Sequence, residues 1–130
     1  MRIGFLNIQG ASGKGPQILS LAKNNNLDLL FLCETYLLST ESCGIPRSNI
    51  IKNLCQIKPA TERGKRTTHG LLLYCPNSTF GNTINFIEET MNYMVCSINE
   101  YIFAFIYWQP SANDEELVDL VEKLSNTYEQ

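Results

Sequence analysis

The chain has 130 residues, of which 44% are hydrophobic and 18% are charged, and its formal net charge is −3. This length is enough for one domain with a buried core, and this composition excludes a disordered chain. The negative net charge excludes nucleic-acid binding through a global positive field. Any phosphate-bearing partner therefore has to be held locally, by a metal ion or a small basic patch.

The first expected elements are a strand, a helix and a second strand. Apolar runs predict strands over Ile3 to Asn7 and Leu29 to Glu34, and the stretch from Gln17 to Asn26 has the apolar spacing of a helix. A strand, a helix and a strand in so few residues form a right-handed crossover with parallel strands. We therefore expect Asn7 and Glu34 at the same edge of a sheet, where ligands of such sheets bind.

The rest of the chain predicts short strands and one more helix after a loop-like stretch from Tyr36 to Arg47. Asn99 and Glu100 form a tight turn, which makes the strands on its two sides antiparallel. A helix is expected from Asp114 to Thr127, with Asn113 as its N-cap. The expected strands are Ile50 to Ile57, His69 to Cys75, Thr83 to Ile87, Tyr93 to Ile98 and Tyr101 to Trp108.

The cysteines and the apolar runs indicate the compartment. The sequence has five cysteines and no CxxC pair, and three of the five lie in apolar runs, where cysteine behaves as a core residue. This pattern argues against a disulfide framework or a zinc site and favours a reducing compartment. No apolar run is long enough for a membrane span or a signal peptide, so we expect an intracellular protein, cytoplasmic or nuclear, that is not secreted.

Glu34 is the strongest candidate for chemistry. A carboxylate at the end of a buried strand is costly unless it is solvated, paired or bound to a metal ion. Mg²⁺ needs only one or two protein carboxylates, with water and phosphate oxygens completing its shell. The alternative is a strand end at which Glu34 simply reaches water.

Asn7 and Tyr107 are weaker candidates by themselves. A strand-terminal asparagine often bonds to its own turn, and Asn7 gains meaning only because the crossover brings it to Glu34. Tyr107 ends the apolar run "IFAFI" and is either a core residue or a donor to a phosphate oxygen. The stretch "ERGKRTTH" holds Arg63, Lys65 and Arg66, which form either a solvated loop or a weak contact for nucleic acid.

Two other motifs do not indicate a catalytic or phosphate-binding site. The glycines near Lys14 do not have the spacing of a phosphate-binding loop, because Ile8 stands where that motif needs its first glycine. His69 is the only histidine, and no acidic residue has a spacing that marks it as a partner for a catalytic base. It is therefore interpreted as a residue at the start of a strand.

Several stretches together resemble the endonuclease/exonuclease/phosphatase superfamily, and in style the apurinic-type endonuclease domains of non-LTR retrotransposons. These stretches are "MRIGFLNIQG", "LDLLFLCETYL", "HGLLLYCP" and "FAFIYWQP", and Glu34 to Leu37 is the most specific piece. The resemblance implies that Asn7 orients the substrate phosphate, that Glu34 binds Mg²⁺ (or Mn²⁺), and that Tyr107 assists at the scissile phosphate.

The resemblance also implies what the sequence lacks, namely a later Gly-Asp-x-Asn step and a Ser-Asp-His step. Residues 1–130 then correspond to a single, incomplete domain with an α+β fold, the first half of a four-layer α/β/β/α sandwich with a mixed sheet and two flanking helices. An uncovered sheet surface is expected along "GLLLYC" and "IFAFIYW", so that the lone chain is marginally stable, aggregates or binds a partner.

The expected function is the N-terminal portion of a Mg²⁺-dependent phosphodiesterase similar to a DNA endonuclease, inactive alone. Its partner would be nucleic acid or a phosphate ester, acted on once a C-terminal half completes the site, and no membrane is involved. One alternative is a non-catalytic interaction module or retrotransposon relic that uses an exposed sheet face, including for self-association. Another is half of a phosphatase for small phosphate esters.

Overall fold

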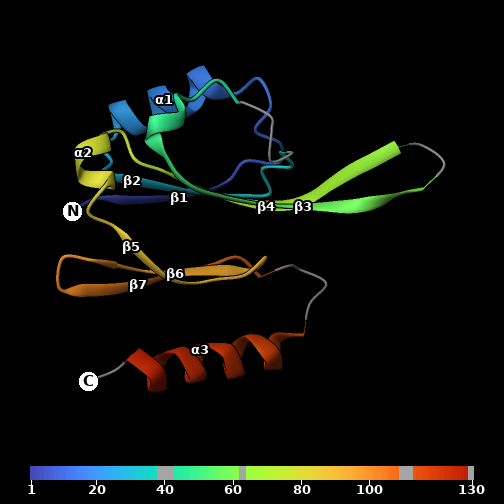
Figure 1. Cartoon of the computed structure of the whole chain (residues 1–130), viewed down its shortest axis with the longest axis vertical. Coiled ribbons are helices and arrows are strands. Elements are labelled where there is room, and N and C mark those ends of the chain that lie inside the picture. Colours follow the sequence, from blue (N-terminus) through green and yellow to red (C-terminus); the bar gives the residue numbers. More distant parts are fainter. Residues whose placement is uncertain (38–42, 62–63, 109–112, 129–130) are drawn as a thin grey trace.

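The computed structural model of the chain describes residues 1–37, 43–61, 64–108 and 113–128, and of residues 55–61 and 64–69 it describes the backbone alone. Four layers follow one another: helix α1, a first sheet, a second sheet and helix α3 (Figure 1). The α+β class, the mixed sheet and the two flanking helices are confirmed. In chain order the elements are β1 (Ile3–Asn7), α1 (Gly15–Asn24), β2 (Leu29–Cys33), the 3-10 helix η1 (Arg47–Asn49), β3 (Ile50–Thr61), β4 (Gly64–Tyr74), α2 (Ser78–Gly81), β5 (Asn85–Glu89), β6 (Tyr93–Ile98), β7 (Tyr101–Ile106) and α3 (Asp114–Tyr128).

The first sheet has the strand order β1-β2-β4-β3. Strands β1 and β2 are parallel, and Asn7 lies opposite Cys33, as the crossover prediction requires. All five residues of β2 are buried, because α1 covers one face of the sheet and the second sheet covers the other. This arrangement places the carboxyl ends of β1 and β2 side by side.

The second sheet is antiparallel, with the order β5-β6-β7. The expected tight turn joins β6 to β7, and Asn99 at this turn has the left-handed φ of 55° that a two-residue hairpin loop demands. Helix α3 begins after Asn113, whose Oδ1 accepts a hydrogen bond of 2.8 Å from the backbone N–H of Glu115. The predicted N-cap is therefore confirmed.

The hydrophobic core lies mainly between the two sheets. Phe31 of β2 stacks on Phe105 of β7 with ring centroids 5.3 Å apart. A second cluster joins α1 to the outer face of the first sheet, and a smaller one joins α3 to the second sheet. The four cysteines whose surroundings are described are free and buried: Cys33, Cys43, Cys75 and Cys96. None of the described helices has the length and apolar character needed to cross a membrane.

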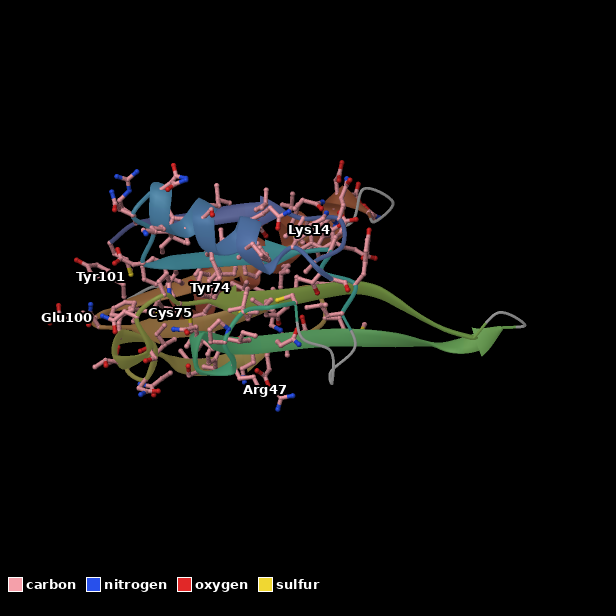
Figure 2. All side chains as sticks on the ribbon, turned by 90° about the horizontal axis from the view of Figure 1, so that it is seen from above. Lys14, Arg47, Tyr74, Cys75, Glu100 and Tyr101 are labelled. Carbon is pink, nitrogen blue, oxygen red and sulfur yellow. The ribbon has the colours of Figure 1, made fainter. Side chains whose placement is uncertain are left out.

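Strands β3 and β4 form a long hairpin. The expected strand Ile50 to Ile57 lies within β3, and the expected strand His69 to Cys75 covers the last part of β4, but the sequence did not predict the extension of both strands toward the hairpin turn. The expected loop around "ERGKRTTH" is wrong for Lys65 and Arg66, which lie on β4, while Arg63 lies outside the described residues. His69 likewise lies inside β4 and not at its start. Only Leu71 to Tyr74 pair with β2, so the rest of the hairpin is a two-stranded arm that projects past the other elements (Figures 1 and 2). In this arm the strands are held by backbone hydrogen bonds between β3 and β4, and their sequences have no alternating apolar pattern.

The uncovered apolar surface differs in part from the expectation. The run "GLLLYC" does not line it, because Leu71 to Cys75 are all buried between α1 and the second sheet. In the run "IFAFIYW" the expectation holds for Ile102, which is 43% exposed, and for Ala104, but Phe105 and Tyr107 are buried between the sheets. Tyr101, just before this run, is 68% exposed. Phe5 of β1 is also 57% exposed. Exposed apolar residues thus occur on the edge strands β1, β5 and β7 and on α3, where Val118 and Val121 are exposed, and they do not cover a whole sheet face.

Candidate functional site

Asn7 and Glu34 meet at the carboxyl ends of β1 and β2. Asn7 is the last residue of β1, and Glu34 follows the last residue of β2, which is the register partner of Asn7. The Nδ2 group of Asn7 donates a hydrogen bond to Oε2 of Glu34, while the Oδ1 atom of Asn7 accepts one of 3.2 Å from the N–H of Gln9. Both earlier interpretations of Asn7 therefore hold: it bonds to its own turn and to Glu34.

Tyr107 reaches the same carboxylate from the second sheet. It follows β7 directly, its backbone N–H donates to the carbonyl of Asn92 over 2.8 Å, and its ring is 9% exposed in the core between the sheets. Burial raises the pKa of the Tyr107 phenol, and a hydrogen bond with Glu34 and the negative charge there raise it further. The three side chains selected from the sequence thus converge on one point.

Tyr36 belongs to the same cluster, although the sequence analysis gave it no role. Its hydroxyl donates to Oε1 of Glu34 over 2.5 Å, and its side chain is 38% exposed. The hydrogen bond with Glu34 raises the pKa of Tyr36, with burial and the nearby charge as smaller causes. The signal was its place two residues after Glu34, within the stretch that carries the resemblance.

The backbone around the site is left-handed at three residues that are not glycine. The φ angles are 49° at Gln9, 54° at Glu34 and 53° at Tyr36. Such a conformation costs an L-residue about 1–2 kcal/mol, and it persists only where the surroundings enforce it. Here the turn after β1 is bonded to the turn after β2, since the N–H groups of Gly10 and Ala11 donate to the carbonyls of Glu34 and Thr35, both over 2.8 Å.

Gly70 and Thr35 form the floor beneath this turn. Gly70 has a φ of 96°, its carbonyl accepts from the N–H of Thr35 over 3.3 Å, and a Cβ atom at this position would overlap Oγ1 of Thr35. Thr35 is fully buried, and its hydroxyl has no hydrogen-bond partner among the residues the structure describes. The strand β4 therefore fixes the turn that presents Glu34.

Positive charge approaches this edge through Lys14. Its Nζ donates a hydrogen bond of 3.0 Å to the carbonyl of Ile8, the residue after Asn7. Lys14 lies well apart from Glu100 and Tyr101 at the β6–β7 turn (Figure 2). Of the weaker candidates, Lys65 and Arg66 lie on β4, and Arg63 lies outside the described residues.

The cluster combines the half-buried carboxylate of Glu34 with hydrogen-bond donors from Asn7, Tyr36 and Tyr107. One carboxylate is the smallest number of acidic ligands with which proteins hold Mg²⁺. Raised pKa values keep both phenols protonated near neutral pH, so Tyr36 and Tyr107 act as donors and not as bases. No group of three or more metal-ligating side chains occurs among the described residues. Mg²⁺ is often held by one or two carboxylates, and Glu34 fits that donor set.

Comparison with known proteins leaves the family open. No protein-family model matches the sequence, and a search of curated proteins finds no match.

Proposed function

We propose that the cluster around Glu34 is part of a Mg²⁺-dependent phosphodiester hydrolase site of the DNA endonuclease kind, in which Mn²⁺ can replace Mg²⁺. Glu34 would hold the metal ion, Asn7 would orient the substrate phosphate, and the hydroxyl of Tyr107 would donate to an oxygen of the scissile phosphate. One observation supports this: side chains from three strands in two sheets meet around a single half-buried carboxylate.

The role of each residue follows from its surroundings. The bound metal ion would supply positive charge that stabilises the transition state. Asn7 is fixed by its bond from Gln9, so its amide points at the metal-binding carboxylate in a constant orientation. Tyr107 is held by the core between the sheets, and its raised pKa keeps the proton that it would donate.

We expect the chain alone to show little or no turnover. The resemblance implies that catalysis also requires a Gly-Asp-x-Asn step and a Ser-Asp-His step, and residues 1–130 contain neither motif. A nicking assay on supercoiled and abasic DNA with Mg²⁺ tests this expectation. Turnover that disappears in Glu34→Gln would show a complete enzyme and overturn it.

Binding of the metal ion tests the site itself. Mn²⁺ titration followed by electron paramagnetic resonance should show one weak site in the unchanged protein and none in Glu34→Gln. Glu88→Gln is the matched control, because Glu88 also accepts hydrogen bonds from two tyrosines, Tyr93 and Tyr128. Equal Mn²⁺ binding by Glu34→Gln and the unchanged protein would remove the proposed function.

Two other functions remain as alternatives. Half of a phosphatase for small phosphate esters would show Glu34-dependent metal binding but contacts with small esters in place of DNA. A non-catalytic interaction module is favoured by a separate observation, the open edge of β7 with its exposed Tyr101 and Ile102.

Under the endonuclease proposal the protein acts in the nucleus or cytoplasm. The four cysteines whose surroundings are described are free and buried, which agrees with a reducing compartment.

A further inference from the structure

Strand β7 has an unpaired edge. It is the last strand of the order β5-β6-β7 and pairs with β6 alone among the strands that the structure describes. An edge of this kind presents backbone N–H and C=O groups to any extended chain that comes close. Proteins normally protect such edges with charged residues, proline or a bulge, but the six residues of β7 read YIFAFI and contain none of these.

The hairpin geometry shows which backbone groups face outward. Ile98 and Tyr101 close a two-residue loop, so they form a hydrogen-bonded pair, and such pairs alternate along an antiparallel ladder. Tyr107 agrees with this alternation, since its N–H points back to Asn92. The residues between the hydrogen-bonded ones therefore turn their N–H and C=O groups to the open edge: Ile102, Ala104 and Ile106.

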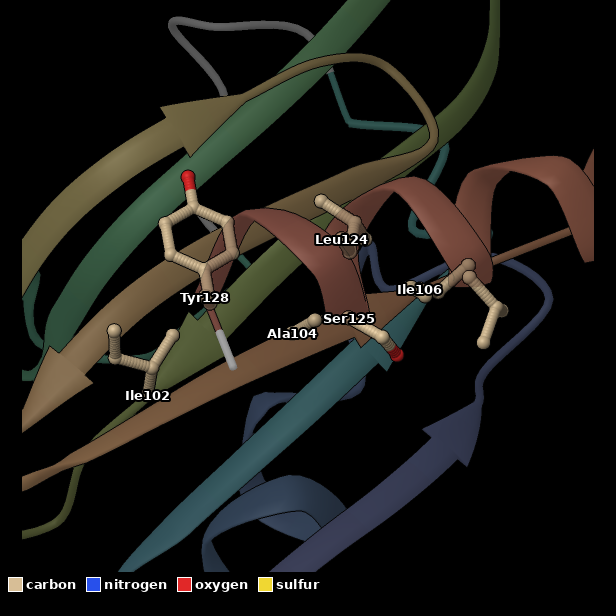
Figure 3. A pocket seen from close by; sticks show the side chains of 7 residues that line it. Ile102, Ala104, Ile106, Leu124, Ser125 and Tyr128 are labelled. Carbon is tan, nitrogen blue, oxygen red and sulfur yellow. The ribbon is translucent and has the colours of Figure 1, made fainter. Parts of the chain in front are cut away.

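The side chains of these three residues also line a groove of about 300 Å³ between β7 and α3 (Figure 3). The helix contributes the other wall with Val121, Leu124, Ser125 and Tyr128.

Helix α3 is anchored mainly over β6 and β5, and of β7 only Ile106 packs against the same cluster among the described residues. Leu124 packs on Tyr93 and Val95 of β6, and the hydroxyl of Tyr128 donates to Glu88 of β5 over 2.5 Å. The strip over β7 is left open.

The inner face of the edge is apolar as well. Phe103 of β7 stacks on Phe105 with ring centroids 6.3 Å apart. Phe105 in turn stacks on Phe31, and Phe31 contacts Phe5 of β1, which is 57% exposed. Strand β1 is itself an edge strand of the first sheet. A chain added beside β7 would therefore find apolar surface on both of its faces.

The charge of α3 indicates the charge of the occupant. The helix carries five acidic residues and one lysine: Asp114, Glu115, Glu116, Asp119, Glu122 and Lys123. Its last turn has no basic residue, so nothing there offsets the negative end of the helix dipole. A second copy paired through its own β7 would bring another acidic α3 to the same face of the joined sheet, which disfavours self-pairing.

We propose that the edge of β7 and the groove beside α3 bind an extended polypeptide segment with an apolar centre and lysine or arginine at its ends, added as a fourth strand of the second sheet. Main-chain hydrogen bonds to Ile102, Ala104 and Ile106 would provide affinity, and the groove would select the side chains. This interaction is independent of the site at Glu34.

A synthetic peptide with a central run of valine and isoleucine and with lysines at both ends is the probe. It should bind and should protect the amides of Ile102, Ala104 and Ile106 from hydrogen exchange, whereas those of Phe103 and Phe105 are protected already. The same peptide with glutamates at its ends should bind several-fold more weakly. Equal binding of the two peptides would overturn the proposal.

Two substitutions make the test specific. Ala104→Pro removes an outward N–H without touching the β6–β7 ladder, and it should weaken binding by on the order of tenfold. Val121→Lys places a charge in the groove and should weaken binding of the basic peptide, whereas Val118→Lys on the same helix, where Val118 is 56% exposed and outside the groove, should not.

The Val121 and Val118 pair decides the question even if Ala104→Pro does not fold. Unchanged binding by Val121→Lys, or amide protection that rises with protein concentration and without peptide, would overturn the proposal, the latter in favour of a second copy.

Discussion

Glu34 combines a half-buried carboxylate with a left-handed backbone, and both are unfavourable for folding. The neighbouring Tyr36 and Gln9 share this backbone conformation. Together the three residues store roughly 3–6 kcal/mol at one edge of the sheet, if each costs about 1–2 kcal/mol. Strained backbone of this kind is common at functional sites, where it holds side chains in a fixed geometry. The strain therefore supports a functional role for the cluster independently of the sequence motifs.

Gly70 is the residue whose replacement should damage this turn most. In Gly70→Ala the added Cβ overlaps Oγ1 of Thr35 and the φ of 96° becomes strained. We expect a loss of about 2–4 kcal/mol of unfolding free energy, measured by urea denaturation. The Mn²⁺ site should weaken in parallel, because Thr35 directly follows Glu34.

Gly13→Ala is the matched control. Gly13 also has a left-handed φ, of 74°, but nothing lies within 4 Å of an added Cβ. Its cost should be about 1 kcal/mol, from backbone strain alone. Adding Thr35→Ala to Gly70→Ala should recover part of the loss, and equal losses in the two alanine variants would contradict this account of the turn.

Tyr107 should make stability sensitive to alkaline pH. Its folded-state pKa is raised above the usual value of 10.0, first by burial and then by Glu34. Below that value both states keep the proton and stability is complete; above it the unfolded state loses the proton first, so stability falls as pH rises. Tyr107→Phe should reduce this fall without abolishing it, since the pKa of Tyr36 is also raised. Urea midpoints measured from neutral pH to above about pH 10 test this.

At the scale of elements, α3 is attached by few contacts. Leu124 is its one buried residue among those described, and the hydroxyl of Tyr128 holds its last turn to Glu88. Tyr128→Phe removes this bond but keeps the ring, so we expect faster amide exchange along α3 and unchanged exchange in β2. Thr127→Val, which removes a hydroxyl bonded only to Lys123 within the helix, should change much less. Equal exchange in Tyr128→Phe and the unchanged protein would show that packing alone fixes α3.

The elements that the sequence predicts well are those whose cause is local. Apolar runs locate β1 and β2, a two-residue turn locates the β6–β7 hairpin, and Asn113 marks the start of α3. The β3–β4 arm is different, because its strands are stabilised by pairing with each other along polar residues, and pairing leaves no periodic signal. The short helix α2 has no distinct sequence signal, since its cap, Asn77, is a residue type that also forms turns.

At the scale of the whole molecule, stability should concentrate in the core between the sheets. Phe31 is fully buried, stacks on Phe105 with ring centroids 5.3 Å apart, and contacts the tilted ring of Phe5 with centroids 5.0 Å apart. Phe31→Ala should cost roughly 3–5 kcal/mol in unfolding free energy, a large share of the total for a domain of this size. Phe5→Ala, at an exposed ring in the same stack, should cost clearly less. Similar losses in the two variants, measured by urea denaturation, would mean that the sheets are not joined through Phe31.

The sequence predicts those residues of the candidate site that lie at the ends of strands. Asn7 and Glu34 follow from the parallel crossover, and Tyr107 follows from the resemblance. Tyr36 had a sequence signal, its place two residues after Glu34, but the left-handed turn that brings its hydroxyl to that carboxylate has none. Gly70 and Thr35 have no sequence signal either, because their roles depend on a contact between β4 and the turn after β2. Such contacts join residues far apart in the chain and need coordinates to be seen.

The buried cysteines can report how often the layers of the molecule separate. Cys43 lies in the cluster beneath α1, whereas Cys96 lies between the two sheets, where burial raises its pKa to about 11. A thiol reagent can reach either group only after the layers around it separate, so each alkylation rate reports one separation. The ratio of the alkylation rates of Cys43 and Cys96 therefore compares how often α1 separates from the first sheet with how often the two sheets separate from each other.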